Sequence, residues 1–139
     1  MTAHRWPVRV YYEDVDLAGI VYYANYLRYI ERARSEMVRA AGIDQAAMRL
    51  EGRVFAVARL EAEYRAPARY DDALVVETRM AARTAARMIL DQAVSRDGTV
   101  LFEARVTIVC MDLAGRPRRL PPAMGALGGP LPHSPSSGA

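Results

Sequence analysis

The sequence predicts an α+β domain in which a five-stranded antiparallel sheet wraps around one long central helix. A helical pattern over residues 24–41 would give a rod about 27 Å long, comparable to the width of a small domain. A sheet curled around such a helix buries most of its surface. One strand precedes the helix and four follow it, and their connections are too short for parallel crossovers.

Strand alternation begins near the N-terminus, and the face predicted to point inward is formed by Trp6, Val8, Val10 and Tyr12. An acidic turn containing Asp14 and Asp16 ends this strand, and Gly19 gives the turn a position where the backbone can bend sharply. The apolar stripe of the following helix is predicted to contain Leu27, Ile30, Ala33, Met37 and Ala41. Gly42 stands where a helix C-cap belongs.

Four further strands are predicted at residues 54–65, 74–82, 87–96 and 101–112, and a short helical turn at 45–50. In the first of these strands, one face is formed by Ala58, Leu60, Ala62 and Tyr64. Pro67 ends that strand, and Asp97-Gly98 predicts a tight hairpin between the last two.

The C-terminal segment is crowded with Gly, Pro and Ser. Its composition predicts one domain at 1–122 followed by a disordered tail at 123–139. No apolar run reaches the roughly 20 residues needed to span a bilayer, and the N-terminus lacks the apolar core of a secretory signal. We therefore expect a cytoplasmic protein.

The net charge is +3, and all 19 basic residues are arginine. Charges of both signs are spread along the chain, so no nucleic-acid surface is predicted. The single Cys110 cannot form an internal disulfide; strand alternation favours a core position, with a nucleophilic role as the alternative. The two histidines, His4 and His133, lie near opposite ends of the chain, so no metal site is predicted.

The acidic turn and the start of the long helix together form a candidate site. The first turn of a helix presents unpaired backbone N–H groups and the positive end of its dipole. A carbonyl lodged there would have its oxygen facing donors and its carbon facing a carboxylate, which suits acyl transfer. In the alternative interpretation, Asp14 and Asp16 are solvated turn or capping residues.

Four segments carry a family resemblance: YYEDVDLAGIVYY with its acidic turn, Asn25-Tyr26, residues 31–34 and the later EYRAPARYDD. Over about residues 5–122 the chain resembles hotdog-fold acyl-CoA thioesterases of the 4-hydroxybenzoyl-CoA thioesterase type. Within them it is similar to the YbgC branch, which is associated with the Tol-Pal system. The resemblance implies hydrolysis of short-chain or aromatic acyl-CoA to a carboxylic acid and free CoA. It implies no separate cofactor, because CoA is part of the substrate.

By this resemblance Asp16 is the catalytic carboxylate, which either attacks the thioester carbonyl or activates water. The backbone N–H of Tyr23 is the implied oxyanion donor, and Gly19 and Ile20 belong to the loop that brings it to the substrate. Many YbgC relatives have histidine where this chain has Tyr23. The 4-hydroxybenzoyl-CoA enzymes resemble WYPNY here, so tyrosine is compatible with hydrolysis, although it cannot replace imidazole as a base at neutral pH.

Further substrate-binding candidates are Ile20, Tyr22 and, for the CoA phosphates, the four arginines Arg83, Arg87, Arg116 and Arg118. Each arginine is alternatively a solvated surface charge, and Tyr22 alternatively a core or interface aromatic. Glu31 is a competing acid on the helix, where pairing on the helix surface is the commoner role. Gln92 is predicted to face inward, where a buried amide usually serves a backbone partner.

The resemblance also implies a homo-oligomer, commonly a dimer with sheets joined edge to edge and often a homotetramer. Some relatives bind acyl carrier protein or phospholipid-synthesis enzymes. Two other functions remain open. A hotdog dehydratase would need a histidine near the acidic turn, and none lies there; a non-catalytic module binding an acyl carrier or an envelope complex stays compatible with the fold.

Overall fold

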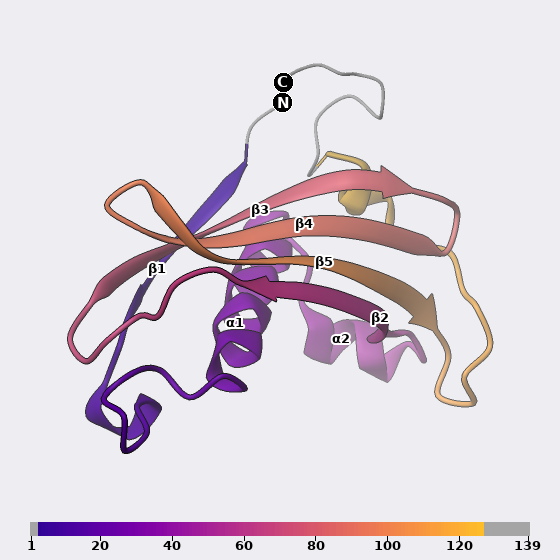
Figure 1. The fold of residues 1–139 in the computed structure, drawn as a ribbon. Coiled ribbons are helices and arrows are strands. Elements are labelled where there is room, and N and C mark those ends of the chain that lie inside the picture. The colour runs from indigo at the N-terminus through magenta and orange to yellow at the C-terminus, as the bar shows by residue number, and fades with distance from the viewer. Residues whose placement is uncertain (1–2, 127–139) are drawn as a thin grey trace.

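The computed structural model describes residues 3–126 of the chain. Its elements are β1 (His4–Arg9), η1 (Tyr12–Asp14), α1 (Asn25–Ala40), α2 (Gln45–Leu50), β2 (Val54–Tyr64), β3 (Ala73–Arg83), β4 (Arg87–Arg96), β5 (Thr99–Met111) and η2 (Pro122–Ala126). The strands form one antiparallel sheet in the order β1-β3-β4-β5-β2, and α1 lies against one face (Figure 1). The predicted hotdog architecture is confirmed.

The α1 helix buries one face against the sheet, mainly against β1, β3 and β4. This buried face consists of Tyr26, Tyr29, Ile30, Ala33, Met37 and Val38. The stripe therefore starts one residue before the predicted Leu27, which is 37% exposed, because two tyrosines occupy the core side of the first turns. Gly42 adopts a φ of 87° just after the helix, as its predicted capping role requires.

The first strand ends earlier than its alternation predicts, since β1 stops at Arg9 and Tyr12 begins a 3-10 turn. The buried Asp14 carboxylate accepts a hydrogen bond from the Tyr11 N–H at 2.8 Å and closes this turn. Consequently Tyr12 is 82% exposed rather than directed inward. Trp6, which was also predicted to point inward, is 36% exposed. Asp14 is thus a capping residue, in agreement with the alternative interpretation.

The β2 strand forms one edge of the sheet and pairs with β5 alone among the described strands. A bulge lies between Val57 and Arg59, after which Leu60 and Tyr64 point to the α1 side. Both side chains remain substantially exposed, at 38% and 50%, because α1 packs mainly against β1, β3 and β4. An uncovered apolar stripe therefore runs along the edge.

The predicted hairpin and the predicted domain boundary have different outcomes. The hairpin is confirmed: Asp97 and Gly98 have φ angles of 50° and 82° between β4 and β5. The domain boundary at residue 122 falls too early, because η2 continues to Ala126 and Met124 is fully buried in the core. The rest of the predicted tail lies outside the described residues. Over residues 3–126, no helix is both long and apolar enough to cross a membrane.

Gln92 links the sheet to the helix inside the core. It is 2% exposed, and its amide donates to the Ile30 carbonyl at 3.0 Å and to the Thr78 hydroxyl at 2.9 Å. Its oxygen accepts from the Arg34 guanidinium at 3.1 Å, and burial lowers the pKa of Arg34. The inward position and the backbone partner of Gln92 are both as predicted.

Replacing Gln92 with leucine should lower the free energy of unfolding by about 2–3 kcal/mol, because Arg34 and Thr78 would lose their partner in a buried site. Urea denaturation followed by circular dichroism would measure the change. Gln45→Leu, on the exposed first turn of α2, is the matched control and should stay within about 0.5 kcal/mol of the wild type. Equal stability of the two variants would contradict a role for the Gln92 hydrogen bonds.

Candidate active site

Asp16 lies in a tight turn between η1 and α1. Its backbone N–H donates to the Ile20 carbonyl, and its carbonyl accepts from the Gly19 N–H, both at 2.9 Å. Gly19 has a φ of 80°, which a residue with a side chain adopts only with strain. One carboxylate oxygen of Asp16 accepts the Ala18 N–H at 2.8 Å, so the side chain is held by its own turn while remaining exposed.

The approach to α1 leaves two successive backbone N–H groups free. The Tyr22 carbonyl accepts from the Asn25 N–H at 2.8 Å, and the Tyr23 carbonyl accepts from the Tyr64 hydroxyl at 2.8 Å. The N–H groups of Tyr23 and Ala24 have no acceptor within residues 3–126. They stand at the positive end of the α1 dipole, where a developing negative charge is stabilised.

A cleft of about 480 Å³ joins the Asp16 turn to this helix start. It is lined by Asp16, Ile20, Val21, Tyr22, Tyr23, Tyr26, Tyr64, Arg65, Ala66 and Pro67. The structure thus brings together four of the predicted site residues in a single cleft. Gly19 shapes the turn beside the cleft without lining it.

The loop that carries these residues is anchored to the segment after β2. The Val21 N–H donates to the Ala68 carbonyl at 2.8 Å, and the Ala68 N–H donates to the buried Tyr26 hydroxyl at 3.0 Å. Asn25 adds a side-chain hydrogen bond to the Asp14 carbonyl at 2.9 Å. The EYRAPARYDD motif therefore supports the cleft as its structural back wall.

Tyr22 and Tyr23 line the cleft together with Asp16, and the two tyrosines interact with each other. Interaction with the Tyr23 hydroxyl raises the pKa of Tyr22, and the Asp16 carboxylate raises it further. Their rings lie 4.8 Å apart between centroids. The Tyr22 hydroxyl consequently stays protonated at neutral pH and is not suited to act as a base there.

The four arginines predicted to bind CoA lie elsewhere. Arg83 and Arg87 flank the turn between β3 and β4, about 30 Å along β4 from the end at which the cleft opens. The Arg83 guanidinium packs beside Gly125. Arg116 pairs with Asp112 at 3.0 Å, and Arg118 follows the far end of β5. One chain alone does not bring these arginines to Asp16.

Six of the residues that line the cleft were not among the predicted site residues, and they include Tyr64 and Arg65. Tyr64 and Arg65 come from the end of β2 and its following residue, and Arg65 pairs with Glu63 and Glu103. Both residues belong to the EYRAPARYDD motif, which showed the family resemblance in the sequence. The resemblance gave neither residue a role.

Glu31, the competing acid, lies away from the Asp16 cleft. It is exposed and lines a smaller hollow of about 220 Å³ between α1, α2 and the sheet. Arg34 and Ser35 share that hollow, together with apolar residues of β2, β4 and β5. Within one subunit, Glu31 therefore cannot act together with Asp16 on the same substrate.

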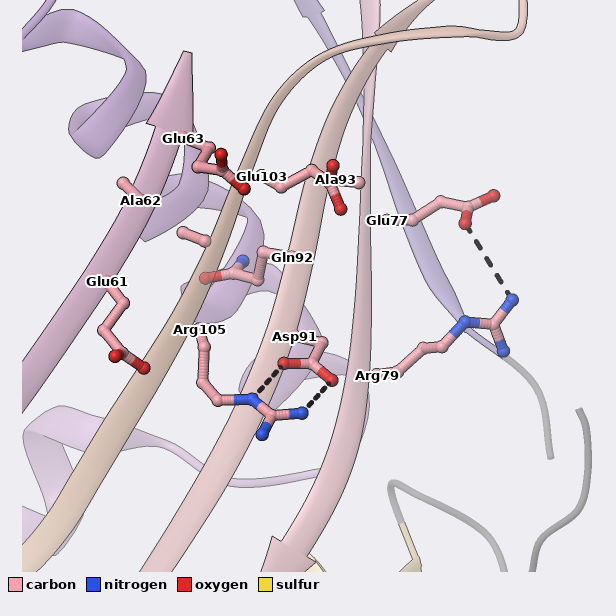
Figure 2. A pocket seen from close by; sticks show the side chains of 11 residues that line it. Glu61, Ala62, Glu63, Glu77, Arg79, Asp91, Gln92, Ala93, Glu103 and Arg105 are labelled. Atoms are coloured by element: carbon pink, nitrogen blue, oxygen red, sulfur yellow. Dashed lines mark hydrogen bonds and ion pairs between the residues drawn. The ribbon is translucent and has the colours of Figure 1, made fainter. Parts of the chain in front are cut away.

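A hollow of about 640 Å³ lies on the sheet face opposite α1 (Figure 2), and it shares no lining residue with the Asp16 cleft. Its acidic side chains are Glu61, Glu63, Glu77, Asp91 and Glu103. Arg105 forms a bidentate pair with Asp91 at 2.7 and 2.8 Å, and Arg79 lies 3.9 Å from Glu77. This face is a network of paired surface charges.

Cys110 is fully buried, and its thiol lies 3.5 Å from the Arg119 carbonyl. Burial raises the pKa of the thiol, so the predicted core position is confirmed and a nucleophilic role has no support. In the described part of the chain, no three His, Cys, Asp or Glu side chains gather closely enough to hold a metal ion.

Sequence comparison identifies relatives over nearly the whole chain. Residues 10–127 match the family described as the thioesterase-like superfamily. The chain is 43% identical to the acyl-CoA thioester hydrolase YbgC of Escherichia coli over 90% of its own length and 95% of that protein. It is 39% identical to the acyl-CoA thioesterase YbgC of Haemophilus influenzae, over 78% of this chain and 80% of that one.

Solved structures similar to this chain also include thioesterases. A probable thioesterase from Bartonella henselae is 35% identical, with a TM-score of 0.82 over 86% of this chain and all of that one. A 1,4-dihydroxy-2-naphthoyl-CoA thioesterase from Synechocystis, at 21% identity, shares the fold with a TM-score of 0.84 over 96% of this chain and 100% of that one. The chain therefore belongs to the thioesterase-like superfamily and is a hotdog-fold thioester hydrolase of the group that contains the YbgC proteins.

Proposed function

We propose that this protein hydrolyses acyl-CoA thioesters, with Asp16 as the catalytic carboxylate and the Tyr23 N–H as the oxyanion donor. The observation that carries the proposal is the cleft itself, which is lined both by Asp16 and by Tyr23, whose backbone N–H is free. A thioester carbonyl in this cleft has its oxygen facing N–H donors and its carbon facing a carboxylate.

Two chemical routes use the same groups. In the first, an Asp16 oxygen bonds to the acyl carbon, the C–S bond breaks, and CoA leaves as a thiolate that takes a proton from solvent. Water then hydrolyses the mixed anhydride and frees Asp16. In the second, Asp16 removes a proton from water as the water attacks the acyl carbon; the C–S bond then breaks, and the proton passes from Asp16 to the departing CoA thiolate. Both routes yield a carboxylic acid and free CoA.

The walls of the cleft favour a short or aromatic acyl group. Three tyrosines, Tyr22, Tyr23 and Tyr64, line it with substantially exposed rings. Aromatic rings can stack on a flat acyl group or pack against a short aliphatic one. The proposed reaction needs no separate cofactor, since CoA enters as part of the substrate.

We further propose a homodimer formed through the edge of β2. The uncovered stripe on this strand includes Val57, at 49% exposure, and Leu60. An exposed strand edge of this kind is normally covered. Two antiparallel copies paired about Leu60 place Arg59 of each copy opposite Glu61 of the other, which matches the charges and buries leucine against leucine.

Other features of the proposal come from family resemblance alone. They are pairing of two dimers into a homotetramer, a cytoplasmic location, a link to the Tol-Pal system, and contacts with acyl carrier protein or phospholipid-synthesis enzymes. A non-catalytic binding module on the same scaffold is not favoured, because the chain matches thioester hydrolases over most of its length.

The proposed function is tested by measuring free thiol release from a panel of short-chain, aromatic and long-chain acyl-CoAs. We expect turnover, with the highest kcat/KM for short or aromatic acyl groups. Isothermal titration with a non-hydrolysable acyl-CoA analogue serves as the companion measurement. Binding of the analogue without turnover of any acyl-CoA would support the binding module and contradict the hydrolase.

A further inference from the structure

The two free N–H groups before α1 belong to peptide units whose carbonyls are held. In a trans peptide the N–H points opposite to the C=O, so a contact that fixes the carbonyl also aims the N–H. The Asn25 N–H fixes the Tyr22 carbonyl and thereby aims the Tyr23 N–H. The Tyr64 hydroxyl fixes the Tyr23 carbonyl and thereby aims the Ala24 N–H.

Tyr64 reaches this peptide from a distant part of the chain, 41 residues away in sequence. It is the last residue of β2, and its ring packs edge-on against Phe102 and Tyr26, with centroids at 4.9 and 5.5 Å. Both neighbours are almost completely buried. The sheet core therefore fixes the Tyr64 ring, and the ring fixes the position of its hydroxyl.

The hydrogen bond also affects the chemistry of the peptide. A carbonyl that accepts a hydrogen bond draws electron density from its own amide, so the attached N–H becomes a stronger donor. Burial raises the pKa of Tyr64, and the neighbouring Tyr23 adds to this shift. The hydroxyl consequently remains protonated, and able to donate, throughout the neutral pH range.

We infer that Tyr64 is a positioning residue for thioester hydrolysis, whose hydroxyl holds the Tyr23–Ala24 peptide so that the amides before α1 face the acyl oxygen. The inference rests on the proposed function and adds to it a residue from the edge strand. Tyr64 does not touch the reacting atoms in this role; it acts through the backbone of Tyr23.

The test is Tyr64→Phe, which keeps the ring packing and removes only the hydroxyl. We expect kcat for acyl-CoA hydrolysis to fall about tenfold, because a slightly misdirected donor stabilises the transition state less well. KM should change by less than about twofold, since the walls of the cleft are unchanged. The ¹⁵N resonance of Ala24 should shift, because its nitrogen is conjugated to the Tyr23 carbonyl.

The matched control is Tyr70→Phe. Tyr70 is 60% exposed, packs against Tyr12, and makes no hydroxyl hydrogen bond within residues 3–126. We expect wild-type kcat and KM for it. A merely structural role of Tyr64 would lower the thermal midpoint and leave kcat unchanged, whereas positioning lowers kcat at constant midpoint.

The outcomes separate the two proposals. Wild-type protein that releases no thiol contradicts the proposed function and the positioning role together. An active wild type with an equally active Tyr64→Phe variant overturns the positioning role alone, as does a variant that changes only KM. A lowered kcat with unchanged KM, midpoint and oligomeric state supports it.

Discussion

Replacing Asp16 with asparagine is expected to lower kcat for thioester hydrolysis by about 10³-fold or more, because an amide can neither attack the acyl carbon nor accept a proton from water. The substitution is nearly isosteric. The oxygen that accepts the Ala18 N–H can be kept, so the turn, the fold and substrate binding should persist. Thiol release at saturating acyl-CoA measures the effect, with circular dichroism and elution volume as checks on folding and assembly.

The matched control is Asp97→Asn. Asp97 is an exposed turn aspartate in the β4–β5 hairpin, and asparagine tolerates its positive φ of 50°. This variant should retain wild-type kcat. An Asp16→Asn variant as active as the control would show that the carboxylate is not catalytic.

The two routes through Asp16 are distinguished by trapping. Hydroxylamine added during turnover converts a mixed anhydride partly into a hydroxamate on Asp16, which mass spectrometry of the digested protein detects. General-base catalysis never makes a bond between Asp16 and the acyl group, so that route leaves Asp16 unmodified. The modification is thus expected only if Asp16 is the nucleophile.

Local patterns predicted most of the fold, and long-range pairing explains the parts that they missed. The helix, four of the strands and the Asp97-Gly98 hairpin follow from periodicity and turn chemistry. The strand β1 was predicted to extend to Tyr12, and it ends earlier for a local reason that the alternating pattern does not reveal. Tyr12 continues the apolar pattern, yet the Asp14 carboxylate caps the backbone and turns the chain first.

The residues of the candidate site also fall into those that the local sequence predicts and those that only the fold brings together. Asp16, Ile20, Tyr22 and Tyr23 were predictable because they lie within one short stretch before the helix. Tyr64 joins them only because β2 ends beside that stretch, which periodicity does not reveal. The four predicted arginines lie away from the cleft within one chain for a topological reason. Arg83 and Arg87 flank the β3–β4 turn, and Arg116 and Arg118 follow β5, so all four lie at the opposite end of the sheet.

Replacing Leu60 with a charged residue is expected to dissociate the proposed dimer. In the proposed register Leu60 faces its own copy, so Leu60→Glu would place two carboxylates against each other. Such a contact costs about 3 kcal/mol or more, which raises the dimer Kd by about a hundredfold or more. Sedimentation equilibrium at several concentrations measures the shift. Leu50→Glu, at an 88% exposed leucine on α2, is the control and should leave the mass unchanged.

The same position allows a test by complementation. Leu60→Arg alone should also be monomeric, because two guanidinium groups would then oppose each other, whereas an equimolar mixture with Leu60→Glu should form a heterodimer. Thioesterase activity should be lost in the monomers and restored in the heterodimer. Tyr64 and Arg65, at the end of β2, line the cleft, so a second copy paired with this strand would lie beside it. A mixture that stays monomeric, or variants with the mass of the wild type, would contradict pairing about Leu60.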